Sequence, residues 1–258
     1  MISVIIPTLN AGKFLRQTLL SIYAQDYSSY EVIVVDSYSD DDTLRIIREY
    51  GQRFNSISKD KLRYFGMDRE GQVAAINYGM ALARGDILTY INYDDVYEKG
   101  AFRIVNANFS AFRPEWVYGK GEVIDAQGNP TRSIVTKFKS YWWKKNSERV
   151  LSWFDYICQP TVFFRRSLWE KVGAFNPDYK YCMDYDYWLR CWKIEAPLFI
   201  DAHIANWRAH SDAISVRNTN AQIDESLRIN LPYAQSTKDI VIQNIVAWGE
   251  KVVYGVIK

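Results

Sequence analysis

Short apolar runs rich in β-branched residues alternate with segments of helical spacing through the first 118 residues. The apolar runs are "ISVIIP", "YEVIVVD", "KLRYF", "DILTYIN" and "EWVYG". Between the first two, "GKFLRQTLLSIYAQ" places Leu15, Leu19 and Ile22 on one side of a helix. Because continuous apolar strands alternate with helices, this half predicts a mostly parallel sheet that is covered by helices on both faces.

The second half of the chain is less regular. "VIDAQGNPTRSI" predicts a hairpin that turns at Gly128, Asn129 and Pro130, and "QPTVFFRRSLWEKVGAF" predicts a strand entering a helix. "DYDYWLRCWKI" suits a helix and "PLFIDA" a strand. Since no internal repeat or linker-like stretch interrupts the chain, we expect one α/β domain over residues 1–258 with an embellished C-terminal half.

Charge and cysteine content narrow the class of protein. The net charge is +2, from 32 basic and 30 acidic residues, so no electrostatic footprint supports nucleic-acid binding. Three cysteines without a CxxC pair indicate reduced, buried thiols in a cytoplasmic protein. The first residues do not read as a signal peptide, and no apolar run approaches the roughly 20 residues that span a bilayer.

Polar side chains follow the predicted strands at the point where each strand ends. Thr8 and Asn10 follow the first strand, Asp36 ends the second, and Asp94 and Asp95 follow "DILTYIN". The carboxyl ends of parallel strands meet at one edge of the sheet, which is where open α/β sheets bind ligands. Two adjacent carboxylates repel unless a cation or a donor takes up their charge, so the pair predicts Mg²⁺ or Mn²⁺ bound together with a diphosphate.

Five segments together resemble inverting glycosyltransferases of family 2, which have the GT-A fold. They are "SVIIPTLNAGKFLRQTLLSIYAQDY", "EVIVVDSYSDDDT", "GQVAAINYGMALARGDILTYINYDD", "QPTVFFRRSLWEKVGAF" and "MDYDYWLR". The resemblance covers about residues 1–210. It implies a nucleotide-sugar donor, with a UDP-sugar favoured, and a divalent metal, Mn²⁺ or Mg²⁺. It also implies inverting transfer to a hydroxyl of a glycan or lipid-linked acceptor, in cell-surface polysaccharide synthesis.

The same resemblance divides the chain and names donor-side residues. Residues 1–118 form the nucleotide-sugar-binding half, 119–215 the acceptor and catalytic-base half, and 216–258 a helical tail. Asp36 would contact the nucleotide base, Asp94 the ribose and metal, and Asp95 and His210 the metal. The donor-binding set that it implies is Pro7, Thr8, Asn10, Asp36, Asp68, Arg69, Gly71, Gln72, Asn77, Asn92 and Asp94.

Several of these assignments have alternatives. Asn92 stands where many relatives have a carboxylate, which removes one negative charge from the motif. Gly71 and Asn77 suit a role in starting and packing a helix as well as one in donor binding. His210 equally fits a hydrogen-bonded structural residue.

Asp184 in "YCMDYDYWLR" matches the family's catalytic base, with Met183 where an acidic residue is usual. Attack by a hydroxyl on an anomeric carbon needs such a group to take the proton. Asp186 is assigned to the acceptor side or, as the alternative that we favour from helical spacing, to a contact with Arg190 or a backbone amide. An exchange of roles, with Asp186 as the base, is a further alternative. The acceptor-binding candidates are Trp142, Trp143, Trp153 and Asp186.

Two further questions stay open at this level. The tail "DIVIQNIVAWGEKVVYGVIK" reads as an amphipathic helix that packs on its own domain, with peripheral membrane contact as the alternative. A noncatalytic sugar-nucleotide-binding protein is the main rival function. A sugar nucleotidyltransferase is a weaker rival, because "PTLNAGKFL" lacks a Gly-rich basic loop.

Overall fold

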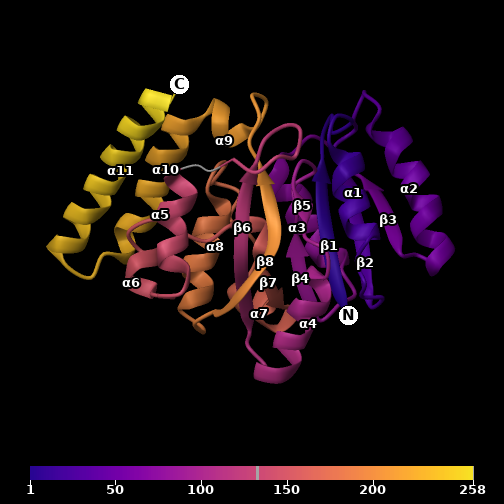
Figure 1. Cartoon of the computed structure of the whole chain (residues 1–258), viewed down its shortest axis with the longest axis horizontal. Coiled ribbons are helices and arrows are strands. Elements are labelled where there is room, and N and C mark those ends of the chain that lie inside the picture. The colour runs from indigo at the N-terminus through magenta and orange to yellow at the C-terminus, as the bar shows by residue number, and fades with distance from the viewer. Residues whose placement is uncertain (132–133, 258) are drawn as a thin grey trace.

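The computed structural model describes residues 1–131 and 134–257, whose strands form one sheet in the order β3-β2-β1-β4-β7-β6-β8-β5 (Figure 1). In chain order, the strands are β1 (Ile2–Thr8), β2 (Tyr30–Asp36), β3 (Leu62–Gly66), β4 (Ile87–Tyr90), β5 (Val96–Tyr97), β6 (Trp116–Ile124), β7 (Phe163–Arg165) and β8 (Leu198–Arg208). Strands β3, β2, β1 and β4 are mutually parallel, as the first half of the sequence predicts. Strand β7 runs antiparallel to both β4 and β6 and so joins the two halves in one mixed sheet.

Helices cover both faces of this sheet. The α-helices are α1 (Leu15–Tyr23), α2 (Thr43–Ile57), α3 (Gln72–Leu82), α4 (Ala101–Phe112), α5 (Ile134–Trp143), α6 (Glu148–Leu151), α7 (Arg166–Val172), α8 (Met183–Trp192), α9 (Ile214–Arg217), α10 (Thr219–Asn230) and α11 (Thr237–Ile257). Two short 3₁₀ helices are η1 (Gln159–Thr161) and η2 (Leu231–Tyr233). The prediction of an α/β fold is therefore confirmed.

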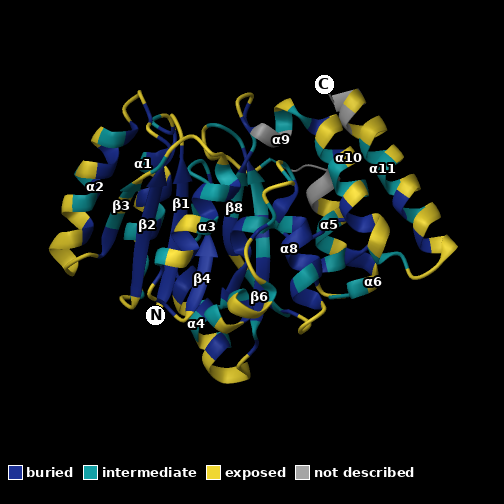
Figure 2. Cartoon of the chain, turned by 180° about the vertical axis from the view of Figure 1, so that it is seen from behind, coloured by how far each residue is buried: buried dark blue, intermediate teal, exposed yellow. Residues whose placement is uncertain are grey.

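Alternate residues of the buried strands enter two separate cores. Val4 and Val34 pack in a cluster with residues of α1, α2 and α4, whereas Ile5 and Val35 pack in a second cluster with residues of α3 and α8. This period of two follows from the pleat of the strands. It explains why the strand sequences are apolar throughout rather than alternating, since each face meets a helical layer (Figure 2).

The structure of the second half differs from the sequence-based prediction in three places. The stretch around "KFKSYWW" has no clean periodicity yet forms α5, and β6 and β8 extend well beyond "EWVYG" and "PLFIDA". The predicted hairpin is reduced to a tight turn, because Ile124 and Pro130 form a single antiparallel bridge. Arg132 and Ser133, which the hairpin prediction also covered, lie outside the described residues.

The C-terminal helices pack on the half of the molecule that carries α5, α6 and α8, at the opposite end from α2 (Figure 1). Asp239 and Gln243 of α11 have no exposed surface, and Val246 packs against the second core. Packing of the tail on its own domain is thus a feature of the structure. No helix in the described part of the chain has both the length and the hydropathy to span a membrane.

Candidate active site

Asp36, the last residue of β2, fixes the turn that follows the strand. It has no exposed surface. Its Oδ1 accepts hydrogen bonds from the hydroxyls of Thr8, at 2.8 Å, and Ser39, at 2.6 Å, and its Oδ2 accepts the Ser39 backbone N–H at 2.9 Å. Asn10, at a φ of 51°, accepts the Asp40 backbone N–H on Oδ1 at 3.0 Å. These bonds tie the ends of β1 and β2 together at the carboxyl edge of the sheet.

Asp95 lies behind that edge rather than on its surface. Its side chain has no exposed surface, and its Oδ1 accepts the backbone N–H of Arg208 at 2.9 Å. Asn92 donates to its Oδ2 at 3.3 Å. Burial, followed by the neighbouring charge of Asp94, raises the pKa of Asp95 well above its usual range. Asp95 therefore connects the end of β8 to the turn after β4.

Arg208 has the same structural character. It is 1% exposed, and its guanidinium donates to the backbone carbonyls of Asp94, at 2.7 Å, and Asp125, at 3.0 Å, and to Gln17 Oε1, at 2.7 Å. These acceptors occupy the guanidinium from several sides, so Arg208 holds the turn after β4 in place and is not directed at a ligand.

Asp94 and His210 meet at this edge. His210 Nε2 lies 2.9 Å from Asp94 Oδ2, and the His210 ring packs on Phe14 with 4.5 Å between ring centroids. The backbone N–H of Asp212 donates to His210 Nδ1 at 3.2 Å. A neutral imidazole that accepts on Nδ1 carries its proton on Nε2, so His210 donates to Asp94. In this tautomer the two groups satisfy each other, and His210 could ligate a metal through Nε2 only with its proton on Nδ1 and the hydrogen bond from Asp212 given up.

This donor set suits a divalent cation that also binds a diphosphate. Mg²⁺ and Mn²⁺ sites at phosphates typically take one or two protein ligands, and substrate and water oxygens complete the coordination. Within residues 1–131 and 134–257 no group of three or more His, Cys, Asp or Glu side chains is arranged to hold a metal. Asp94 and His210 fit the ligand set of such a shared site, and they do not form an all-protein cage.

Two residues of the donor-side prediction, Gln72 of α3 and Asn92 after β4, form a chain of hydrogen bonds that ends at Asp95. Gln72 Nε2 donates to Asn92 Oδ1 at 2.7 Å, and the Asn92 amide in turn donates to Asp95. An amide at position 92 can therefore accept from one neighbour and donate to the other, which a carboxylate cannot do.

The remaining donor-side candidates support backbone or lie at the surface. Arg69 donates to the backbone carbonyls of Ser37, at 3.3 Å, and Tyr38, at 3.0 Å, and Asp68 is exposed beside it. Pro7 lies buried within β1. Gly71 precedes α3 at a φ of 97°, which favours glycine.

Asn77 has its side chain taken up elsewhere. It donates to the Phe175 carbonyl and accepts the Phe175 N–H, both at 2.9 Å. The structure therefore gives Asn77 the helix-packing role that was the alternative in the sequence, and we leave it out of the donor site.

Asp184, in the first turn of α8, lines a cavity of about 90 Å³ between α5, α8, α10 and α11. Asp155, Glu250 and Lys139 line the same cavity. Burial raises the pKa of Asp184 to about 7, and the adjacent Asp155 carboxylate adds to the increase. Burial likewise raises the pKa of Asp155 to about 6, against the opposing charge of Lys139. A carboxylate with a pKa near neutrality is suited to take up a proton at physiological pH.

The donor-side and base-side carboxylates influence the same two residues. Tyr90 ends β4, and its pKa is raised by burial and by the charges of Asp184 and Asp95. Burial raises the pKa of Cys158 to about 12, and Asp95, Asp155 and Asp184 add to the shift. Because these interactions fall off with distance, Tyr90 and Cys158 lie within electrostatic range of both Asp95 and Asp184.

The other predicted acceptor-side residues have structural partners. Asp186 forms an ion pair with Arg190 at 2.9 Å, the alternative that helical spacing favours. Trp143 is 6% exposed, and its Nε1 donates to the Tyr156 carbonyl at 2.9 Å. Trp153 Nε1 donates to Asp239 at 2.8 Å.

Trp142 is partly buried and packs against the second core. Of the three tryptophans, Trp143 is buried, and Trp142 and Trp153 are half-buried.

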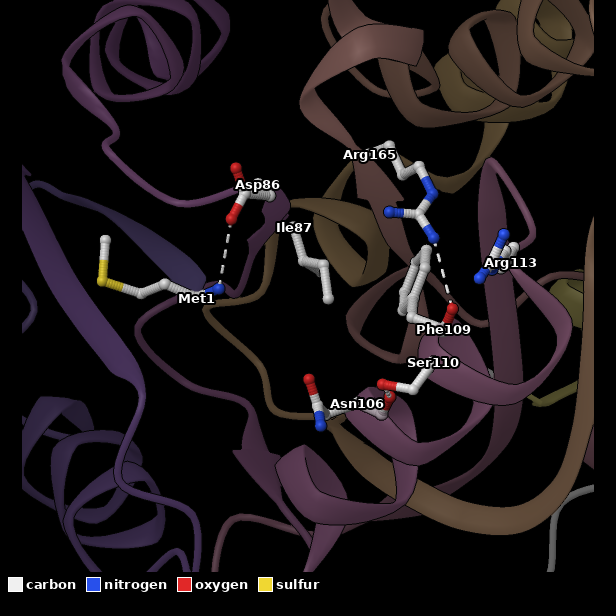
Figure 3. A pocket seen from close by; sticks show the side chains of 8 residues that line it. All are labelled: Met1, Asp86, Ile87, Asn106, Phe109, Ser110, Arg113 and Arg165. Carbon is white, nitrogen blue, oxygen red and sulfur yellow. Dashed lines mark hydrogen bonds and ion pairs between the residues drawn. The ribbon is translucent and has the colours of Figure 1, made fainter.

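A larger hollow, of about 540 Å³, lies at the opposite edge of the sheet (Figure 3). It is lined by Asp86 and Ile87 at the start of β4 and by Phe109 of α4. Figure 3 shows the Met1 ammonium directed at Asp86 and the Arg165 guanidinium directed at the Phe109 carbonyl. None of the predicted site residues lies there, so size alone does not identify the site in this fold.

Comparison with known proteins decides the family. The family model described as Glycosyl transferase family 2 matches residues 3–173. The chain belongs to this glycosyltransferase family.

Curated relatives of this glycosyltransferase agree with that assignment. A PGL/p-HBAD biosynthesis glycosyltransferase of Mycobacterium tuberculosis is 30% identical over 193 residues, which cover 74% of this chain and 69% of the relative. An uncharacterized glycosyltransferase of Rickettsia conorii is 27% identical over 224 residues, covering 85% of this chain and 36% of the relative. The chain therefore spans about a third of the length of the rickettsial protein.

Solved structures of glycosyltransferases share the fold. The mannosyltransferase PcManGT from Pyrobaculum calidifontis, in complex with GDP-Man and Mn²⁺, superposes with a TM-score of 0.69 at 18% identity, over 96% of this chain and 69% of that one. S. aureus TarS 1-349 in complex with UDP-GlcNAc gives a TM-score of 0.67 at 18% identity, over 94% of this chain and 69% of that one. The glycosyltransferase described here thus has the GT-A fold.

Sequence reasoning missed three members of the base-side cavity of this glycosyltransferase. Lys139 and Asp155 lie in a basic, aromatic stretch without clean periodicity, and Glu250 lies in the tail, which reads as an amphipathic helix. Only a charged residue inside an aromatic run, as in "WFDYI", offered a signal for Asp155.

Proposed function

We propose that this protein is a metal-dependent inverting glycosyltransferase, which moves a sugar from a nucleoside-diphosphate donor to a hydroxyl of a glycan or lipid-linked acceptor. The observation that carries the proposal is the contact between Asp94 and His210 at the carboxyl edge of the sheet, together with the cavity that Asp184 and Asp155 line at the start of α8. One pair supplies a cation and diphosphate site at the edge of the sheet. The other supplies a proton acceptor.

Asp94 is the proposed metal ligand, and His210 would join it through Nε2 in the tautomer that carries the proton on Nδ1. We prefer Asp94 to Asp95, because both carboxylate oxygens of Asp95 have partners and its side chain has no exposed surface. A bound Mn²⁺ or Mg²⁺ neutralises the charge that develops on a diphosphate leaving group. Asn92 and Gln72 keep Asp95 in place behind this site, and Asp36 fixes the loop where the nucleoside would lie.

Asp184 is the proposed general base. As the acceptor oxygen bonds to the anomeric carbon, the bond from that carbon to the diphosphate oxygen breaks. The hydroxyl proton moves to Asp184, and the nucleoside diphosphate leaves with the bonding electron pair. A single displacement of this kind inverts the anomeric centre. The raised pKa of Asp184 makes its carboxylate a stronger base than an ordinary aspartate.

The donor is proposed to be a UDP-sugar, and the setting to be cell-surface polysaccharide synthesis on the cytoplasmic side of a membrane. Solved neighbours whose titles name UDP-GlcNAc and GDP-Man support a nucleoside-diphosphate donor. The three free cysteines suit a reducing compartment.

A panel of UDP-, GDP- and dTDP-sugars tests the proposal, with nucleoside diphosphate release measured with Mn²⁺ and with EDTA. We expect release from at least one donor with the metal, and at least a hundredfold loss of rate in Asp184→Asn with donor binding retained. Donor binding without turnover in any metal would favour the noncatalytic alternative. Full turnover in Asp184→Asn would remove this residue from its role.

A further inference from the structure

Helix α11 buries a polar face. Asp239 accepts hydrogen bonds from Trp153 Nε1, at 2.8 Å, and Arg149 Nε, at 3.0 Å. One turn later, the Gln243 amide donates to the backbone carbonyls of Ser152, at 2.8 Å, and Asn230, at 2.9 Å. Further along the same face, Glu250 lines the cavity of the proposed base.

The opposite face of α11 is apolar and open. Val241, Ile245, Trp248 and Val252 are 51%, 60%, 68% and 44% exposed. Their spacing of three and four residues places them in one row, about 200° around the helix axis from the buried row, at 3.6 residues per turn. We call Val241, Ile245, Trp248 and Val252 the outer row.

This arrangement is the inverse of an ordinary surface helix, which buries its apolar face and exposes its polar one. An exposed row of large apolar side chains on one helix marks an interaction surface more often than a chance feature. Figure 2 shows that this helix forms one end of the molecule, so nothing else in the described structure covers its outer side.

Charge beside the outer row indicates what it contacts. Both acidic residues of α11, Asp239 and Glu250, point inward, whereas Lys238 and Lys251 lie on the two sides of the outer row. Lys251 pairs with Asp224 of α10. Lys238 forms no ion pair within the described residues.

A second copy of this chain fits the outer row poorly. Symmetric pairing would bring lysines toward lysines, with no acidic side chain of α11 available to pair with them. An anionic lipid surface instead accepts apolar side chains below its headgroups and attracts lysines at headgroup level, and a tryptophan is well placed at that boundary.

We propose that the outer row of α11 docks the protein on the surface of an anionic lipid bilayer, with the helix lying in the plane of the interface. The proposal rests on the proposed function in one respect only: docking would hold the cavity of Asp184 next to a surface that carries lipid-linked acceptors. Lipid binding itself requires neither donor nor acceptor.

Vesicle flotation without donor or metal tests the proposal on the full chain. Vesicles of neutral phosphatidylcholine are compared with vesicles containing 40% phosphatidylglycerol, at low and high salt. We expect binding to the anionic vesicles that falls with salt, and at least a tenfold loss in the double variant Ile245→Ser, Trp248→Ser. Phe112→Ser is the matched control, because Phe112 is 70% exposed on α4, away from α11, and its loss should leave binding unchanged.

The outcomes separate the alternatives. Absence of binding to anionic vesicles, or equal binding by the double variant and the intact chain, overturns the proposal. A concentration-dependent dimer that the double variant abolishes would assign the outer row to a second copy and also overturn it. Thermal melting of each variant verifies folding. Nucleoside diphosphate release in solution without vesicle binding would leave the proposed transferase function in place.

Discussion

Removing the charge of Asp155 should shift the pH dependence of sugar transfer. Asp155 and Asp184 line one small cavity, and the Asp155 charge helps to raise the pKa of Asp184 to about 7. The other charged or titratable groups that act on Asp184 or line its cavity are Lys139, Glu250, Cys182, Tyr185, Tyr90 and Cys158. The substitution Asp155→Asn keeps the shape of the side chain and removes one negative charge from this set.

The size of the shift follows from Coulomb's law. Two carboxylates roughly 5 to 10 Å apart interact by about 1.7 to 3.3 kcal/mol at an effective dielectric constant of 20. Each pKa unit corresponds to about 1.4 kcal/mol, so the Asp155 charge is worth about one to two units at Asp184. A general base acts only when deprotonated. In the wild type, kcat/KM should therefore rise through pH 7, and in Asp155→Asn this rise should occur about one unit lower.

Nucleoside diphosphate release from the donor identified in the panel gives the profile between pH 5 and 9. Asp178→Asn is the matched control, because Asp178 is exposed and does not line the cavity. Its profile should coincide with that of the wild type. An acidic limb that does not move in Asp155→Asn, or that moves equally in Asp178→Asn, would refute the electrostatic coupling that we infer.

Three further outcomes follow from the site. Asp94→Asn should weaken Mn²⁺-dependent donor binding at least tenfold, measured by isothermal titration, with little loss of stability. Asp95→Ala should instead lower the free energy of unfolding by about 1–3 kcal/mol, measured by urea unfolding, because it leaves the Arg208 N–H and the Asn92 amide unpaired. Asn92→Asp adds a third carboxylate beside Asp94 and Asp95 and removes a hydrogen-bond donor to Asp95. The melting temperature should therefore fall without metal and recover as Mn²⁺ is added. An equal fall with and without metal would contradict this. Hydrogen bonds from Trp153 and Ser236 lower the pKa of Asp239 to about 2, so its stabilising effect should be complete above pH 4 and lost as the pH falls toward 2. The free energy of unfolding of Asp239→Asn should therefore differ most from that of the wild type near neutral pH, and the two should converge in acid.

The first half of the fold could be predicted because its signals are local. Residues such as Val34 and Val35 are buried on opposite faces of the same strand, so "EVIVVD" is apolar throughout and marks a strand covered by two helical layers. Less of the second half could be predicted from the sequence. Strand β7 pairs antiparallel with β4, which lies more than 70 residues earlier in the sequence, and with β6. Its position depends on Phe163 and Phe164 filling two different cores, which no local pattern reveals.

The candidate site divides in the same way. The predicted parallel topology was enough to place Asp36, Asp94 and Asp95 at one edge of the sheet, because each follows or ends a strand. The sequence does not predict which of these carboxylates faces outward. Asp95 faces inward, where it accepts a hydrogen bond from the backbone N–H of Arg208, a residue 113 positions later. The ring N–H groups of Trp143 and Trp153 donate to Tyr156 and Asp239, which anchors both rings in a way that sequence composition does not reveal. Their assignment to the acceptor side stays a prediction.

Helix α11 lies between the cavity of the proposed base and the proposed lipid surface. Its buried row reaches both Trp153, through Asp239, and the cavity of the proposed base, through Glu250. A rigid helix transmits the position of one face to the other, because its rows are fixed relative to each other. If the outer row lies on lipid, the same helix sets the distance between the bilayer and Asp184. Membrane docking and acceptor positioning would then be two consequences of one element, which explains why polar residues are buried on α11 at the expense of an apolar surface left open.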